Sequence, residues 1–248
     1  MRLIWILVAL LCVGGCATPR NHPAAASSTE ARIKATLNER FPASPIEKVR
    51  PSPYPGWYEI VTPTELVYTD AEANLLFVGK VIDTKTKVDL TSRRLSEAHA
   101  IDFGTLPLAK AIKRVKGNGS RTVAIFEDPN CPYCRQLEHN LEPVTDVTIY
   151  TFLYPLEELH PGATARAHTI WCASDRASAW TKWMQENVEP PKAECTETNT
   201  AELQSLGNSL NIVGTPMTFF ADGHRVEGVI DTPAMERQLS ENVTVVKR

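Results

Sequence analysis

Two cysteines separated by two residues, Cys131 and Cys134, are the feature of this chain with the most specific chemistry. They follow an apolar segment, residues 122–126, and open a helix-compatible segment that ends before Pro143. Cys131 is therefore expected at a helix N-terminus, where unpaired backbone N–H groups and the helix dipole favour thiolate over thiol. A thiolate attacks disulfides, and Cys134 is placed one turn further on to attack the resulting mixed disulfide. Pro132 suits the first helical turn, which needs no N–H donor there.

Other uses of this motif require further residues. A zinc site would need a second matching pair of ligands, and Cys172 and Cys195 stand alone. Haem attachment would need a histidine directly after Cys134, where the chain has Arg135. A purely structural disulfide between Cys131 and Cys134 is an alternative, although the strand-to-helix turn favours a redox-active disulfide. The sequence predicts neither a metal nor a cofactor.

Thr215 and Pro216 carry a second signal, because they precede an apolar segment and a hairpin turn at Asp222–Gly223. A cis Thr215–Pro216 bond would present backbone groups for strand-like pairing with a peptide substrate. An ordinary trans proline at the start of a strand is the alternative.

The remaining two cysteines, Cys172 and Cys195, lie in a mainly helical segment. Four cysteines beyond the N-terminal region are an even number, as expected in an oxidising compartment. We expect Cys172 and Cys195 to form a structural disulfide worth about 2–4 kcal/mol. A second redox relay is the alternative.

The first residues predict export. Residues 1–2 give a positive start and residues 3–13 are apolar, which indicates a signal peptide over residues 1–15. The small residues before Cys16 resemble a bacterial lipobox, which implies lipidation of Cys16 and a membrane anchor. Ala17 lacks the aspartate that retains lipoproteins at the inner membrane, which favours the outer membrane. Ordinary cleavage that releases a soluble product is the alternative.

Composition and segment order predict an α+β protein of ordinary globular type. Hydrophobic residues make up 43% of the chain, and the net charge of −3 gives no electrostatic argument for nucleic acid binding. Four segments are predicted after the signal peptide: a flexible tether at 16–28, a small helix-plus-sheet domain at 29–91, a helical linker at 92–116, and a catalytic domain at 117–248 with a helical insertion at about 156–211. The catalytic domain has a β-α-β start and a β-β-α finish, which is a thioredoxin-like layout.

In combination, these features resemble the DsbC/DsbG family of periplasmic protein disulfide isomerases. The residues that carry the resemblance are 49–59, 126–134, 167–175, Cys195 and 214–216. They span nearly the whole chain that would remain after signal-peptide removal.

The resemblance implies a V-shaped homodimer of cystatin-like N-terminal domains, whose thioredoxin-like domains face a shared apolar cleft. It also implies misoxidised secreted proteins as substrates, a periplasmic location, and a DsbD-type membrane reductase that keeps Cys131 reduced. Thr215, Pro216, Pro132 and Tyr133 are the expected substrate-contacting residues. The Pro132–Tyr133 dipeptide is closer to the DsbG pattern than to the Gly-Tyr of DsbC, and this dipeptide tunes redox potential and substrate choice.

These features predict an enzyme that reduces and isomerises non-native disulfides, with Cys131 attacking and Cys134 resolving. A DsbG-like chaperone, in which the cleft matters more than the thiols, is one alternative. Reduction of sulfenic acids on other proteins is another. A net oxidase is disfavoured, because dimerisation in the family blocks the oxidising partner.

Overall fold

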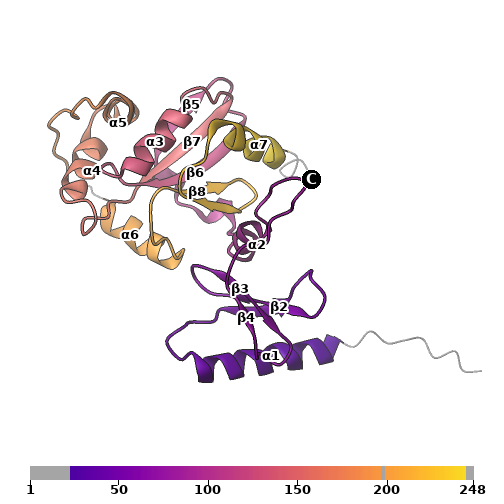
Figure 1. Ribbon diagram of the computed structural model, residues 1–248. Coiled ribbons are helices and arrows are strands. Elements are labelled where there is room, and N and C mark those ends of the chain that lie inside the picture. The colour runs from indigo at the N-terminus through magenta and orange to yellow at the C-terminus, as the bar shows by residue number, and fades with distance from the viewer. Residues whose placement is uncertain (1–22, 197–198, 244–248) are drawn as a thin grey trace, which may run out of the picture.

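The computed structural model describes residues 23–196 and 199–243. They form two units, an N-terminal sheet with one helix and a larger sheet with helices around it, and helix α2 lies between them (Figure 1). The predicted signal peptide at 1–15 and the predicted lipidation residue, Cys16, lie outside the described residues. Over the described ranges, no helix has the length and apolarity needed to span a membrane.

The N-terminal unit is an antiparallel meander in the order β1-β2-β3-β4, with α1 along it (Figure 1). Its elements are α1 (Pro23–Arg40), β1 (Lys48–Pro51), β2 (Trp57–Val61), β3 (Leu66–Asp70) and β4 (Leu76–Phe77). Ile33 and Leu37, one helical turn apart, are buried against Val49 and Ile60 of the sheet. The amphipathic spacing of α1 therefore positions the helix on the sheet.

Helix α1 begins earlier than the sequence predicted. The backbone of residues 23–28 is helical, whereas this stretch was assigned to the flexible tether at 16–28. Proline is well suited to the first helical position, and alanine is the strongest helix former, so Pro23 and the alanines that follow extend the helix.

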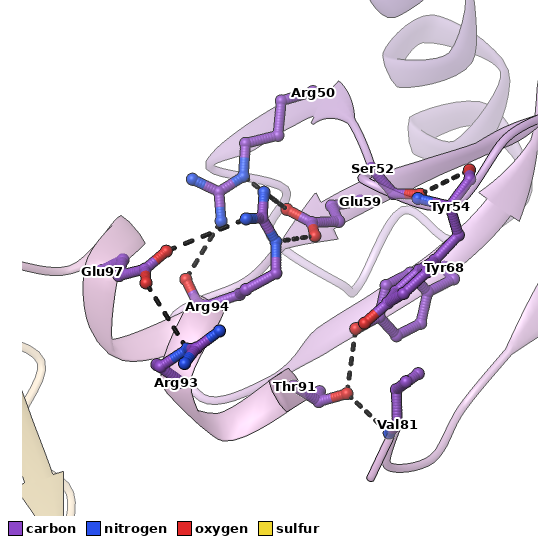
Figure 2. A network of polar contacts seen from close by, with 10 residues as sticks. All are labelled: Arg50, Ser52, Tyr54, Glu59, Tyr68, Val81, Thr91, Arg93, Arg94 and Glu97. Atoms are coloured by element: carbon purple, nitrogen blue, oxygen red, sulfur yellow. Dashed lines mark hydrogen bonds and ion pairs between the residues drawn. The ribbon is translucent and has the colours of Figure 1, made fainter. Parts of the chain in front are cut away.

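A buried carboxylate, Glu59 on β2, fastens α2 (Leu90–Ala98) to the N-terminal sheet (Figure 2). Its Oε2 accepts hydrogen bonds from Arg50 Nε at 2.6 Å and from Arg94 Nη2 at 2.9 Å. Arg50 Nη2 in turn donates to the Arg94 carbonyl at 3.0 Å. Because two arginines satisfy this carboxylate, its burial is tolerated and α2 is fixed in position.

The larger unit is a five-stranded mixed sheet in the order β5-β7-β6-β8-β9, in which only β6 and β7 run parallel. The strands are β5 (Ile112–Lys116), β6 (Arg121–Glu127), β7 (Val147–Leu153), β8 (Met217–Phe220) and β9 (Arg225–Glu227). The helices are α3 (Pro132–Asn140), α4 (Ala163–Cys172), α5 (Arg176–Glu186), α6 (Thr200–Ser209) and α7 (Thr232–Val243), and 3₁₀ turns lie at Phe103–Thr105 and Leu108–Lys110.

Both faces of this sheet are covered. Leu137 of α3 and Leu239 of α7 pack on one face in a single apolar cluster. On the other face, Phe126 and Phe152 stack at 4.7 Å between ring centroids, in a cluster that includes Leu203 of α6. This arrangement agrees with the α+β class and the β-α-β, helical insertion, β-β-α order that the sequence predicted.

The helical linker predicted over 92–116 is only partly helical. Helix α2 ends at Ala98, and Ile112–Lys116 is strand β5, which pairs antiparallel with β7. Ile112 faces the core, but Val115 is 57% exposed and the inward position between them holds Arg114. Because a charged residue occupies an inward position, the alternating pattern of a strand was hidden in the sequence.

A polar junction joins the two units. Ser96 of α2 exchanges hydrogen bonds with the backbone of Arg225 on β9. The Arg225 guanidinium donates to His99 Nδ1 at 2.8 Å, and His99 Nε2 lies 2.8 Å from a carboxylate oxygen of Glu47. The five-stranded sheet of the larger unit therefore contacts α2 and the segment before β1.

Replacing Glu59 by glutamine should weaken the N-terminal unit. Glu59→Gln removes the negative charge that two arginines share, and we expect a loss of about 2 kcal/mol in the free energy of unfolding. Urea denaturation of the full chain measures this loss. Arg93→Gln is the matched control, because Arg93 is exposed and its one ion pair with a described residue is to the exposed Glu97, so its change should stay within about 0.5 kcal/mol. Equal stability of both variants would show that the buried network contributes nothing.

Candidate active site

Strand β6 leads through a tight turn into α3, and Cys131 occupies the N-cap position of that helix. Its backbone is extended, with φ −75° and ψ 124°, and Pro132 follows as the first helical residue. The turn is held by Asp128, which accepts hydrogen bonds from the N–H of Cys131 through its carbonyl at 3.1 Å and from the N–H of Asn130 through Oδ1 at 2.7 Å. The local sequence therefore places a cysteine sulfur at a helix N-terminus.

The cis-proline loop lies against this sulfur. The Thr215–Pro216 peptide bond is cis, and Cys131 Sγ lies 3.4 Å from the Thr215 carbonyl oxygen. The structure thus brings the Cys131–Cys134 motif and the Thr215–Pro216 loop together, although Cys131 and Thr215 are 84 positions apart in sequence. The Gly228 N–H donates to the Pro216 carbonyl at 2.8 Å, which ties the loop to the end of β9.

The two thiols are free and differ in acidity. A hydrogen bond with Cys134 is the main cause that lowers the pKa of Cys131 to about 5, and the backbone N–H groups of Cys134 and Tyr133 lower it further. Burial raises the pKa of Cys134 well above its usual value, and its hydrogen bond to Cys131 and the nearby Glu127 raise it further. Near neutral pH, Cys131 is a thiolate and Cys134 is its thiol partner.

A layer of buried charge lies beside α3. Glu138 of α3 is fully buried and accepts a hydrogen bond from Arg114 Nη1 at 2.6 Å and from Trp180 Nε1 at 2.9 Å. Burial would raise the pKa of Glu138, but the Arg114 guanidinium reverses this and holds it below its usual value. Burial and the charge of Glu138 raise the pKa of the neighbouring Glu127 well above the ordinary range. Glu127 therefore binds a proton more readily than an exposed glutamate does, and it lies close enough to Cys134 to affect the pKa of that thiol.

His160 is a site residue that sequence reasoning missed. Its Nδ1 lies 2.9 Å from Oδ2 of Asp128, and the same oxygen accepts the N–H of Leu156 at 2.6 Å. Asp128 is fully buried, so these contacts fix the carboxylate whose other oxygen holds the active-site turn. His160 lies 32 positions from Asp128 in sequence, and no local pattern signals the pairing.

Two of the predicted substrate-contacting residues border a groove beside Cys131. The groove has a volume of about 360 Å³ and is lined by Tyr133, Gln136, Gly214, Thr215, Glu227, Gly228 and Val229. Tyr133 is 60% exposed at its rim. Pro132, which precedes Tyr133, is exposed, whereas Pro216, which follows Thr215, is buried, and neither of these prolines lines the groove. An extended peptide that enters this groove would meet the Thr215 backbone next to Cys131 Sγ.

Cys172 and Cys195 form a disulfide that links the end of α4 to the segment before α6. Cys195 packs against the apolar cluster that holds Cys131 and Cys134, so the disulfide stabilises the core around the two thiols. His168 lies within 4.8 Å of both sulfurs, a spacing that would suit a metal ion. Because both sulfurs are bonded to each other, they offer no thiolate ligands in this state.

Removing the Cys134 thiol should raise the pKa of Cys131. Cys134→Ala takes away the main donor to the Cys131 thiolate, so its pKa should rise by a unit or more from about 5, whereas Cys134→Ser keeps a donor and should shift it less. The rate of alkylation against pH measures both pKa values. An unchanged pKa in Cys134→Ala would show that the helix N-terminus alone sets the acidity of Cys131.

The same shift has a consequence for the stability of the reduced protein. A lowered pKa in the folded state stabilises the fold above the ordinary thiol pKa of 9.0, and this contribution is lost as the pH falls through about 5.

Comparison with known proteins agrees with this geometry. A thioredoxin-like domain family matches residues 108–242, and the family of disulfide bond isomerase protein N-terminal domains matches residues 24–92. The chain is 41% identical over 207 residues to a probable thiol:disulfide interchange protein DsbC of Bordetella parapertussis, covering 84% of this chain and 73% of the relative. A protein of the same description from Bordetella avium is 42% identical over 212 residues, covering 86% and 75%.

A crystal structure of a disulfide interchange protein from Neisseria gonorrhoeae is also similar. Its TM-score is 0.54 at 42% sequence identity, and the match covers 56% of this chain and 99% of that one. The share matched in each chain indicates that the likeness is confined to about half of the present protein.

Proposed function

This chain belongs to the DsbC family of thiol:disulfide interchange proteins, and on that premise we propose that Cys131 is its attacking thiol and Cys134 its resolving thiol. The protein is an enzyme of thiol–disulfide exchange. One observation carries the assignment of roles: at a single helix N-terminus, the pKa of Cys131 is lowered to about 5 while that of Cys134 is raised. Only Cys131 is a ready nucleophile at neutral pH.

The reaction begins when the Cys131 thiolate attacks one sulfur of a substrate disulfide. The substrate S–S bond breaks, the other substrate sulfur leaves as a thiolate and takes a proton, and a mixed disulfide remains on Cys131. In reduction, Cys134 loses its proton and attacks Cys131 Sγ, which releases the substrate thiol and leaves a Cys131–Cys134 disulfide. In isomerisation, a second substrate thiolate displaces Cys131 instead, with no net transfer of electrons. The proposed substrates are misoxidised secreted proteins.

The oxidised Cys131–Cys134 pair must be returned to the dithiol before another attack. We assign this step to a DsbD-type membrane reductase and the protein to the periplasm. We also propose lipidation at Cys16, which lies outside the described residues, and anchoring at the outer membrane. The proposed division is a dimerisation domain at 29–91, a linker that is helical in α2, and a catalytic domain that begins with β5.

The proposed homodimer has a suitable surface in β4. This strand is an edge of the N-terminal sheet and pairs only with β3. Four consecutive apolar side chains are exposed here: Leu76 and Phe77 form the strand, Leu75 precedes it and Val78 follows it. An edge strand with exposed apolar residues is normally covered, and a second copy can pair with it around a twofold axis.

Replacing Cys131 and replacing Cys134 should have different effects on exchange activity. Cys131→Ser should abolish reduction of a disulfide substrate, because no thiolate attacks. Cys134→Ser should accumulate mixed disulfides with substrate, because nothing resolves them. Non-reducing gels and the turnover of a scrambled disulfide protein measure both outcomes. Activity that persists in Cys131→Ser, or mixed disulfides that form on Cys134, would overturn the assignment.

A charge in β4 should dissociate the dimer. Phe77→Glu places a carboxylate in the proposed interface, and we expect a monomer at micromolar concentration and at least a tenfold weaker association by sedimentation. Phe41→Glu is the matched control, because Phe41 is equally exposed at 45% but lies outside β4. If both variants, or neither, changed the oligomeric state, β4 would not be the contact surface.

A further inference from the structure

We propose that the groove beside Cys131 selects substrate cysteines flanked by lysine or arginine, and that Glu227 is the residue that selects them. The proposal rests on the exchange activity assigned to Cys131 and names the class of peptide that this site accepts. It depends on where β9 places one carboxylate, on the charges around that carboxylate, and on the spacing of an extended peptide.

Glu227 is held at the groove by the sheet. It is the last residue of β9 and pairs with Met217, the first residue of β8 after the cis-proline loop. The next residue, Gly228, donates its N–H to the Pro216 carbonyl. The Glu227 carboxylate lies over Gly214, since a Cβ built on that glycine would be only 3.7 Å from Glu227 Oε1. Gly214 directly precedes Thr215, whose carbonyl contacts Cys131.

The charge of Glu227 faces the groove without a partner. Among the described residues that line the groove, Glu227 is the only one that is charged at neutral pH. It is exposed and forms no ion pair within the described ranges. Arg225 interacts with it electrostatically, but the N–H groups of that guanidinium are directed to the Leu210 carbonyl and to His99. A cation supplied by the substrate would therefore complete the site.

The spacing of an extended peptide matches this position. Successive residues of a strand are about 3.4 Å apart. A substrate whose cysteine lies opposite Thr215 places the adjacent residue opposite Gly214, beneath the Glu227 carboxylate. The aliphatic stem of a lysine or arginine there can pack on the exposed Tyr133 ring while its charged end meets the carboxylate. An acidic residue at the same position would be repelled.

Two peptide substrates test the proposal with the full-length protein. They are mixed disulfides of the same peptide with a small thiol, identical except that the residue beside the cysteine is lysine in one and glutamate in the other. Because a partly exposed charge pair contributes modestly, we expect the lysine peptide to react about fivefold faster with the wild-type protein at low salt. Added salt should shrink the ratio.

Three variants test whether Glu227 causes the preference for the lysine peptide. Glu227→Gln should bring the ratio of the two rates close to one, and Glu227→Lys should invert it. Glu186→Lys, which changes an exposed carboxylate on α5 outside the groove, should leave the ratio as in the wild type. The ratio is the informative quantity, because an altered acidity of Cys131 or a general loss of structure changes both rates together.

The possible results separate this proposal from the assigned activity. A wild-type ratio near one, a preference that persists in Glu227→Gln, or equal changes in both rates would overturn selection by Glu227 while leaving exchange intact. Failure of the wild-type protein to react with either peptide would instead overturn the exchange activity itself.

Discussion

The buried ion pair between Arg114 and Glu138 is the constraint on which the catalytic domain depends most. Glu138 projects from the active-site helix, Arg114 from β5, and Trp180 from α5, so one carboxylate joins three elements far apart in sequence. Arg114 also donates to Thr151 of β7 at 3.1 Å. Charges buried this deeply are tolerated only when each is paired and hydrogen-bonded, so the helix, the edge strand and the helical insertion must assemble together.

This network also bears on the chemistry of the two thiols. Because Glu138 keeps its negative charge beside Arg114, the neighbouring Glu127 is driven toward its neutral form. Burial is the main cause of the raised pKa of Cys134, and its hydrogen bond to Cys131 raises it further, so this thiol stays protonated and can donate to the Cys131 thiolate. The acidity of Cys131 therefore has two origins, the helix N-terminus and a partner thiol whose proton is retained by its buried surroundings.

The parts of the site that could be predicted from sequence are those encoded locally. The motif at 131–134 lies in a strand, turn and helix that are continuous in sequence. The strands expected before and after it are present in the five-stranded sheet as β6, β7, β8 and β9. Strand β5 was misread because Arg114 occupies an inward position and Val115 an outward one, which reverses the usual polarity of a strand. The contact between Asp128 and His160 joins two loops, and only tertiary structure places them together.

The junction between the two units gives β9 a second role. An arginine guanidinium can only donate, so the Nδ1 of His99 must accept from Arg225, and its Nε2 must carry the proton that faces Glu47. One neutral tautomer of His99 therefore links the catalytic sheet to the segment before β1. The same three-residue strand carries Arg225 at this junction and Glu227 at the substrate groove. Since β9 is short and lies at the edge of its sheet, the position of the groove carboxylate depends on contacts with α2 and the N-terminal unit as well as on the catalytic domain itself.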